Sequence, residues 1–112
     1  MVNKKVVIAF AVMVSVSVSS GAFAAGDAAA GKSKSAVCVA CHGPSGVSTS
    51  DLWPNLAGQK QAYIMKQLKA FREGSRTDPL MSGMAKPLSD EDIENLAAYF
   101  SSQSAAPAAG QH

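Results

Sequence analysis

The stretch Cys38-Val39-Ala40-Cys41-His42 holds both cysteines of the 112-residue chain and one of its two histidines. Two cysteines three positions apart lie on one side of a short helical turn, so both sulfurs can reach the edge of one macrocycle. A histidine directly after the second cysteine can swing beneath a metal ion held there. C-x-x-C-H is the attachment sequence of c-type haem, in which two thiols bond covalently to the macrocycle and the imidazole ligates its iron. The stretch therefore predicts one haem c, attached through Cys38 and Cys41, with His42 as an axial ligand.

A C-x-x-C pair also occurs in thiol–disulfide redox sites, in zinc sites and as a structural disulfide. A structural zinc site needs four ligands, and the chain offers two cysteines and two histidines, one of which is the terminal His112. A thioredoxin-like site lies beside a β-α-β pattern, which the sequence does not show. A disulfide across three positions closes almost no loop and restrains the unfolded chain little. Haem attachment is therefore favoured.

The first 24 residues are expected to form an export signal. Lys4 and Lys5 supply its positive charge, an apolar run extends over residues 6–18, and Ala22-Phe23-Ala24 is an A-x-A cleavage site. The apolar run is shorter than the ~20 residues of a transmembrane helix, so no stable membrane insertion is expected after cleavage. We expect cleavage after Ala24 and a mature chain in the periplasm of a bacterium, which fits haem attachment outside the cytoplasm.

Cleavage leaves 88 residues, which we divide into a haem domain over residues 25–103 and a flexible tail over residues 104–112. A chain this short often needs a cross-link or a bound cofactor for stability, and a buried haem supplies apolar surface and two covalent bonds. The remaining charge is balanced, with eight basic and eight acidic residues, because Lys4 and Lys5 are two of the ten bases. No strong basic field indicates a nucleic-acid partner.

Three helical segments, and no sustained period-2 alternation, predict an all-α domain. The first runs from about Asp27, its N-cap, into the haem motif, and Gly31 is the one interruption of its Ala-rich sequence. The second runs from about Gln59 to Glu73 and ends at Gly74. The third begins at Ser89, where the sequence Ser-Asp-Glu-Asp is typical of a capping box. The expected buried stripes are Ile64, Leu68 and Phe71 in the second segment and Ile93, Leu96, Ala97 and Phe100 in the third.

Two long connections join these segments, over residues 43–58 and 74–87. The first is rich in Gly, Pro, Ser and Asn and contains the only tryptophan, Trp53. Loops this long are uncommon in a compact domain unless they serve a function. Wrapping a cofactor would explain both.

The second axial position of the iron decides the chemistry, and the residues leave several candidates for it. Met65 lies within the second helical segment, where a methionine is more often core packing, and His112 ends the tail. Met81 and Met84 lie in the second long connection, where a thioether can approach iron without deforming a helix. On the residues alone Met81 and Met84 are equal, and an open iron site is a further alternative.

Beyond the haem motif, an ordered set of short motifs runs through the chain: Ala30-Gly31-Lys32, Pro54 with Leu56-Ala57-Gly58-Gln59, Tyr63 with Gln67-Leu68, Phe71-Arg72-Glu73-Gly74-Ser75-Arg76, Met81-Ser82-Gly83-Met84, Leu88-Ser89-Asp90 and Ala97-Ala98-Tyr99-Phe100. Together with the haem motif, this set resembles class I bacterial cytochromes c, in particular the haem domains of the cytochrome c4 type and the related small periplasmic monohaem cytochromes. C-x-x-C-H alone is shared by many haem proteins, and the ordered set is far more specific. The resemblance covers about residues 25–103.

The resemblance implies the class I cytochrome c fold, with three main helices wrapped around one covalently bound haem. It also implies Met81 as the second axial ligand, with Met84 as the runner-up. In the family the ligand methionine precedes the leucine of the Leu-Ser-Asp helix start by seven residues, and Leu88 is that leucine here.

Two packing features follow from the same resemblance. The Pro54 carbonyl is expected to accept a hydrogen bond from the ring N–H of His42 and so to fix the orientation of the imidazole. Gly31 is expected to let the first and last helices cross closely, with Tyr99 or Phe100 packed against it.

With His42 and Met81 both bound, the iron has no vacant position for a substrate, which suits outer-sphere electron transfer and not catalysis. We therefore expect a periplasmic electron carrier and not an enzyme. Its donor would be a bc1-type complex or a dehydrogenase, and its acceptor a terminal oxidase or reductase. The alternative is the electron-transfer cytochrome subunit of a dehydrogenase complex such as sulfide dehydrogenase. If Met81 does not bind iron, a haem peroxidase or a gas-binding protein is the expectation.

The expected docking surface is an apolar patch at the haem edge with charged residues at its rim. Five bases either form that rim or belong to a solvated helix face: Lys60, Lys66, Lys69, Arg72 and Arg76. The acids at residues 90–94 fit helix capping better than a partner. Proteins of the c4 type usually carry two haem domains in tandem, and the resemblance here covers one. Single-domain function and a homodimer that restores the pair are therefore both open.

Overall fold

The computed structural model describes residues 5, 7–17 and 26–105. In chain order its elements are α1 (Ala28–Lys34), α2 (Ala36–His42), the 3₁₀ turn η1 (Pro44–Gly46), α3 (Gln61–Glu73), α4 (Met81–Ala85) and α5 (Asp90–Ser102). The described residues contain no strand, so the all-α prediction is confirmed.

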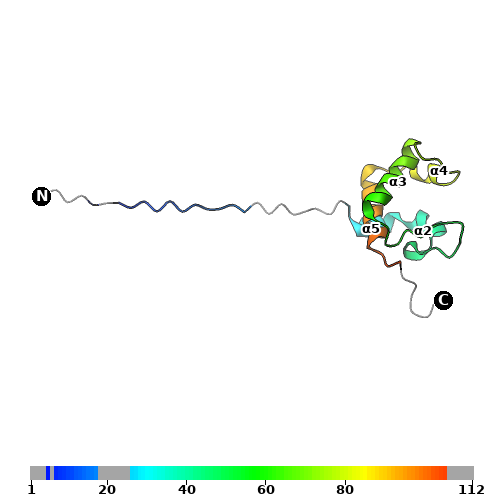
Figure 1. Ribbon diagram of the computed structural model, residues 1–112, viewed down its shortest axis with the longest axis horizontal. Helices are drawn as coiled ribbons and strands as arrows, with labels where there is room; N and C mark the ends of the chain where they lie inside the picture. Colours follow the sequence, from blue (N-terminus) through cyan, green and yellow to red (C-terminus); the bar gives the residue numbers. More distant parts are fainter. Residues whose placement is uncertain (1–4, 6, 18–25, 106–112) are drawn as a thin grey trace.

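Residues 5 and 7–17, the described part of the expected export signal, form no helix and lie well away from the helical domain (Figure 1). Their large apolar side chains are exposed, Met13 among them. Within the described residues, no helix is both long and apolar enough to cross a membrane. The expected cleavage site after Ala24 and the tail residues 106–112 lie outside the described residues.

The first helical segment, predicted to run without interruption from about Asp27 into the haem motif, is two helices, and the break between them lies at Ser35. Asp27 is the N-cap of α1, and its side chain accepts hydrogen bonds from the N–H groups of Ala29 and Ala30. The hydroxyl of Ser35 donates to the carbonyl of Lys32 at 2.7 Å, a local bond that competes with the helical ladder. Gly31 stays inside α1 and is buried.

The helices α1 and α5 cross closely at Gly31, as the sequence resemblance implies. A Cβ atom on Gly31 would collide with the backbone carbonyl of Asn95 and with the side chain of Tyr99. The side chain of Asn95 also accepts a hydrogen bond from the backbone N–H of Asp27 at 2.7 Å. Tyr99 is therefore the aromatic residue at this crossing, and Phe100 packs instead against Gly46.

The second predicted helix is α3, which begins at Gln61, two residues later than predicted, because Lys60 has a non-helical backbone with ψ 129°. It ends where predicted, at Gly74, which adopts the left-handed conformation with φ 84° and donates its N–H to the carbonyl of Ala70. Its buried residues are Ile64 and Phe71. Ile64 packs with residues of α5 in the central apolar cluster: Leu96, Ala97, Tyr99 and Phe100.

The last helix, α5, begins with the predicted capping box. The Ser89 hydroxyl accepts from the N–H of Asp92, and the Asp92 carboxylate accepts from the N–H of Ser89, both at 3.0 Å. Asp92 also pairs with Lys34 of α1 at 3.4 Å. Asp92 therefore acts within the fold, in helix capping and in an ion pair between α1 and α5.

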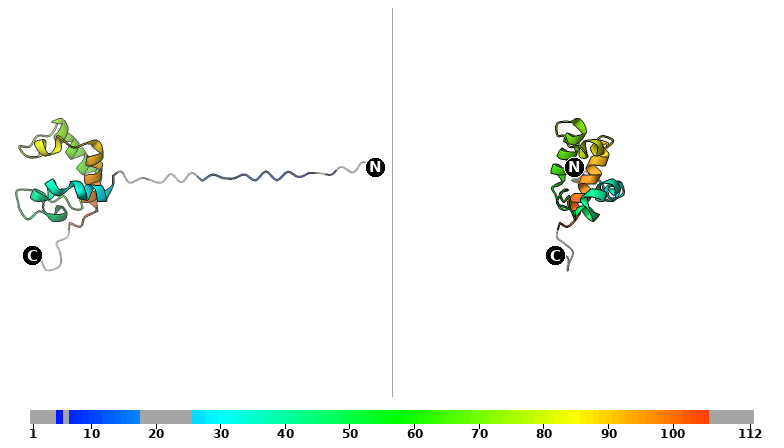
Figure 2. Two further views of the ribbon diagram at one scale, coloured as in Figure 1. Left: turned by 180° about the vertical axis from the view of Figure 1, so that it is seen from behind. Right: turned by 90° about the vertical axis from the view of Figure 1, so that its right-hand side faces the viewer.

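The segment predicted as a loop over residues 74–87 contains a short helix, α4, which periodicity does not reveal because five residues span little more than one turn. Figures 1 and 2 show α4 and the end of α3 on one side of the domain, with α2 and its following loop on the other. Helix α4 contacts α3. The two long connections thus lie at the same end of the domain, one on each side of it.

Replacing Gly31 with alanine should lower the free energy of unfolding by about 2 kcal/mol, because the added methyl group must push α1 away from a backbone carbonyl of α5. Gly83→Ala is the matched control, since Gly83 is also helical and a Cβ there meets nothing within 4 Å. The control should stay within about 1 kcal/mol of the parent. Urea unfolding of the haem-loaded protein, followed by far-ultraviolet circular dichroism, measures both. Equal effects of the two substitutions would contradict a close crossing.

Candidate haem-binding site

Helix α2 carries the whole C-x-x-C-H motif. The two thiols are free and half-buried, three positions apart on the helix. Cys38 packs against the central apolar cluster, and burial raises the pKa of its thiol. His42 is the last residue of α2 and is buried. Gly43 then turns the chain away with φ 84° and ψ 163°, in a space where a side chain would collide with the carbonyl of Val47.

The His42 ring is held by a hydrogen bond to the loop that follows α2. The distance from its Nδ1 to the carbonyl oxygen of Pro54 is 2.7 Å. A carbonyl only accepts, so Nδ1 carries the hydrogen and donates it. The tautomer then leaves the lone pair on Nε2, the nitrogen that can bind a metal ion. Pro54 therefore determines which nitrogen of His42 is available.

The loop after α2 holds the Pro54 carbonyl in place through backbone hydrogen bonds. The carbonyl of Gly46 accepts from the N–H groups of Leu56 and Ala57 at 2.8 and 3.1 Å. The side-chain oxygen of Asn55 accepts from the N–H of Ser48 at 2.7 Å. These bonds tie the residues around Pro54 to the turn η1 directly beyond His42. The Pro54 carbonyl is thus held close to the end of α2, where His42 lies, by hydrogen bonds within the loop that joins them.

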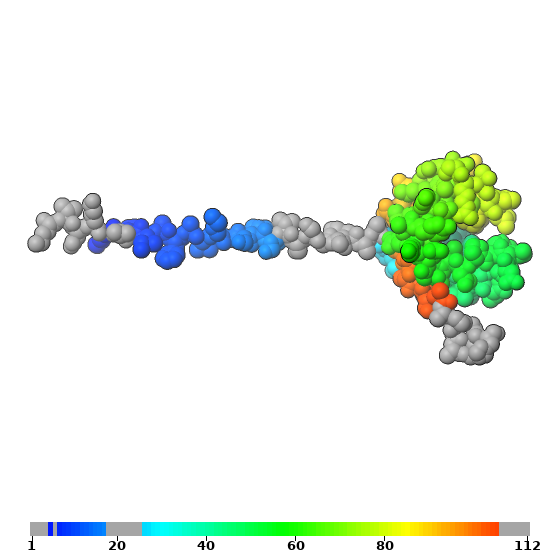
Figure 3. All heavy atoms as spheres, viewed as in Figure 1, coloured from blue at the N-terminus to red at the C-terminus, as the bar shows by residue number. Residues whose placement is uncertain are grey.

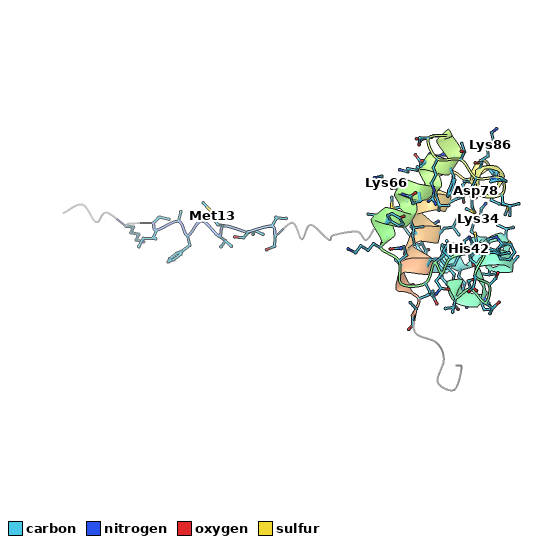
Figure 4. The ribbon with its side chains drawn as sticks, turned by 45° about the vertical axis from the view of Figure 1, so that its right-hand side comes forward. Met13, Lys34, His42, Lys66, Asp78 and Lys86 are labelled. Atoms are coloured by element: carbon cyan, nitrogen blue, oxygen red, sulfur yellow. The ribbon has the colours of Figure 1, made fainter. Side chains whose placement is uncertain are left out.

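Helix α4, whose first residue is Met81, lies on the other side of the same end of the domain. Figure 3 shows the loop after α2, in green, and the segment around α4, in yellow-green, as two lobes at that end. Figure 4 places His42 on the first side and Asp78, just ahead of α4, on the second. Met81 is half-buried and Met84 is 42% exposed. The fold therefore brings both candidate thioethers to the end of the domain that carries the haem motif.

The structure gives no support to Met65 or His112 as the second axial ligand. Met65 packs against the central apolar cluster in α3, as expected of a core methionine. His112 lies outside the described residues.

The residues at this end of the domain fit a haem. Two free thiols, an imidazole oriented by Pro54 and a thioether at the same end of the domain make up the donor set of a c-type haem with two axial ligands. Large apolar side chains on the same elements are exposed: Val37, Leu52, Leu80 and Met84. Apolar surface left open beside such donors suits a large apolar macrocycle.

The two arginines of the five-base set, for which a docking rim and a solvated helix face were the alternatives, are engaged within the fold. Arg72 donates to the carbonyl of Leu88 at 3.1 Å and to the carboxylate of Asp90 at 2.7 Å. Arg76 donates to the side chain of Gln67 at 2.6 Å and lies 4.4 Å from the centre of the Phe71 ring. The structure therefore gives both arginines a role in holding α3 to its neighbours, which the sequence patterns did not reveal. The three lysines of the set lie on or beside α3, with Lys60 and Lys66 exposed.

The chain belongs to the cytochrome c family, whose model matches residues 28–104. Within this family it is a class I c-type cytochrome of the c4 type. Membership makes covalently bound haem c its cofactor, in agreement with the donors described above.

Two relatives and one solved structure support this placement. Cytochrome c4 of Pseudomonas aeruginosa is 51% identical over 82 residues, which are 73% of this chain and 41% of the relative. Cytochrome c-554(548) of Halomonas halodenitrificans is 51% identical over 82 residues, which are 70% of this chain and 99% of the relative. The crystal structure of reduced cytochrome c4 from Pseudomonas stutzeri superimposes with a TM-score of 0.68 at 49% identity, covering 71% of this chain and 47% of that one. The chain thus spans about half the length, or less, of the cytochromes c4 it matches.

The ion pair between Arg72 and Asp90 gives stability a defined pH dependence. The hydrogen bond from Arg72 lowers the pKa of Asp90 below its ordinary value of 3.8. A carboxyl with a lowered pKa in the folded chain contributes fully above its unfolded pKa, and the contribution is lost as pH falls toward the folded value.

In Asp90→Asn, the fall in unfolding free energy between about pH 6 and about pH 3 should therefore be smaller than in the parent. Urea titrations of the haem-loaded protein at the two pH values measure it. Asp51→Asn, which removes an exposed loop carboxylate, is the control and should leave the difference unchanged. If the unfolding free energy of Asp90→Asn falls between the two pH values as much as that of the parent, the ion pair does not stabilise the protein in solution.

Proposed function

We propose that the protein is a carrier of single electrons, with Cys38 and Cys41 holding the haem and His42 and Met81 as axial ligands of its iron. The observation that carries this proposal is the 2.7 Å hydrogen bond from His42 Nδ1 to the Pro54 carbonyl. It leaves Nε2 as the only nitrogen for the iron and keeps the ring from rotating. Met81, on the opposite side of the same end of the domain, supplies the second ligand.

Haem c, when bound, supplies a reversible one-electron iron couple. The chain contributes the ligands and their rigidity. His42 is held by Pro54 and Met81 by the start of α4, so neither side chain needs to move when the charge of the site changes. A pair of protein ligands also leaves no position for a substrate, which supports electron transfer and not catalysis. The protein is therefore proposed not to be an enzyme.

The cellular setting of the proposal rests on the amino-terminal sequence. Residues 1–24 are proposed as a signal peptide, residues 25–103 as the haem domain and residues 104–112 as a tail, with the mature protein in the periplasm. Its partners are proposed to be redox proteins: a bc1-type complex or dehydrogenase as donor and a terminal oxidase or reductase as acceptor. A subunit role in a dehydrogenase complex and a homodimer stay predictions, and the composition and mass of the complex purified from native cells distinguish them.

Met81→Ala should abolish the red-region absorption band of methionine-ligated ferric haem and lower the reduction potential, because a thioether ligand raises it. Met84→Ala is the matched control, since its side chain lies one turn away, and it should leave band and potential unchanged. Visible spectroscopy and a redox titration of both variants provide the measurement. The reverse pattern would assign the ligand to Met84. Rapid binding of carbon monoxide by the unmodified ferrous protein would contradict the carrier function itself.

The mature protein purified from the periplasm should begin at Ala25 and carry the mass of one haem. Intact-mass and amino-terminal analysis by mass spectrometry test both points. A periplasmic protein that retains Met1 would rule out the proposed cleavage.

A further inference from the structure

The carboxylate of Asp78 holds the backbone of Met81. Its Oδ1 accepts hydrogen bonds from the N–H of Met81 and the N–H of Leu80, each at 2.8 Å. A charged acceptor that satisfies two free N–H groups at a helix start is a strong local restraint. Met81 is the first residue of α4, so this restraint acts directly on the residue proposed to bind iron.

A second hydrogen bond closes the restraint around Met81. The hydroxyl of Ser82 accepts from the backbone N–H of Asp78 at 3.0 Å. Residues 78 and 82 are therefore bonded to each other and to the segment between them. Asp78 and Ser82 are both half-buried.

Helix α4 needs this help because it has little stability of its own. A helix of five residues lies far below the length at which an isolated helix is stable in water. Helix α4 packs on α3, and Ala85 is its one buried residue. At the far end of the segment, Arg72 donates to the carbonyl of Leu88, seven residues beyond Met81. Arg72 thus holds the end of this segment, and Asp78 is the residue whose side chain bonds to the backbone of Met81.

We propose that Asp78 is a positioning residue for the second axial ligand, and that its carboxylate keeps the Met81 thioether at the iron by fixing the start of α4. The proposal rests on Met81 being that ligand. It assigns to a surface aspartate a control over how often the sixth position of the iron opens.

The test compares variants of the haem-loaded ferric protein by the rate at which added imidazole replaces the methionine. Imidazole binds only after the methionine has left, so the rate reports how often the position opens. In Asp78→Ala the rate should rise about fivefold, the factor for a lost cap of about 1 kcal/mol. The methionine band should also disappear at a lower temperature than in the parent. In Asp78→Asn, whose amide oxygen still accepts both N–H groups, rate and band should stay close to the parent.

Asp27→Ala is the matched control. Asp27 caps α1 with the same chemistry, accepting from Ala29 and Ala30 at 2.9 and 3.3 Å. Its removal should lower global stability in urea and leave the imidazole rate unchanged. Equal imidazole rates in Asp78→Ala and Asp27→Ala would overturn the positioning role. If Asp78→Ala does not accumulate as holoprotein, Ser82→Ala, which removes only the bond at 3.0 Å, should still raise the rate, by a smaller factor; an unchanged rate would also overturn it.

The variant Met81→Ala distinguishes an error in the role of Asp78 from an error in the assignment of Met81 as the ligand. Loss of the methionine band in Met81→Ala with a parent-like imidazole rate in Asp78→Ala overturns the positioning role alone. Retention of the band in Met81→Ala overturns the ligand assignment and the positioning role with it.

Discussion

The backbones of α1 and α5 approach each other at Gly31 more closely than any side chain there would allow. This crossing aligns α5 with the start of the domain, and its effects reach the haem-binding residues. Phe100 of α5 packs against Gly46, and the Phe100 carbonyl accepts from the N–H of Gly58 at 2.9 Å. Both contacts anchor the loop that carries Pro54. The orientation of His42 therefore depends on a glycine that never touches it.

The two sides of the haem site are built from different interactions. On the α2 side, Cys38 packs into the apolar cluster and the loop is closed by backbone hydrogen bonds. On the α4 side, the segment is held by charged side chains near the surface, through Asp78 at its start and Arg72 at its end. Local stability follows buried apolar contacts, so the α4 side is expected to open first. The proposed Met81 ligand is therefore expected to be released more easily than the His42 imidazole.

The sequence patterns predicted helix ends best where the signal is local. Asp27, Gly74 and Ser89 cap their helices as expected, because a cap needs only the few residues beside it. The break at Ser35 was missed, because a serine is also found inside helices and only its hydroxyl bond to the Lys32 carbonyl shows that α1 ends there. Helix α4 was missed because five residues carry no periodic signal, although Asp78 stands three residues before Met81 as a capping residue would.

The sequence by itself determined the cofactor and the all-α class, because covalent haem attachment and helix capping depend on residues close together in the chain. The resemblance to class I cytochromes c added Met81 as the expected second axial ligand and the Pro54 carbonyl as the expected partner of His42. Only the tertiary structure decided what depends on distant segments meeting: the α1–α5 crossing at Gly31 and the bonds from Arg72 to Leu88 and Asp90. No local pattern encodes such contacts, since each exists only after separate helices have packed.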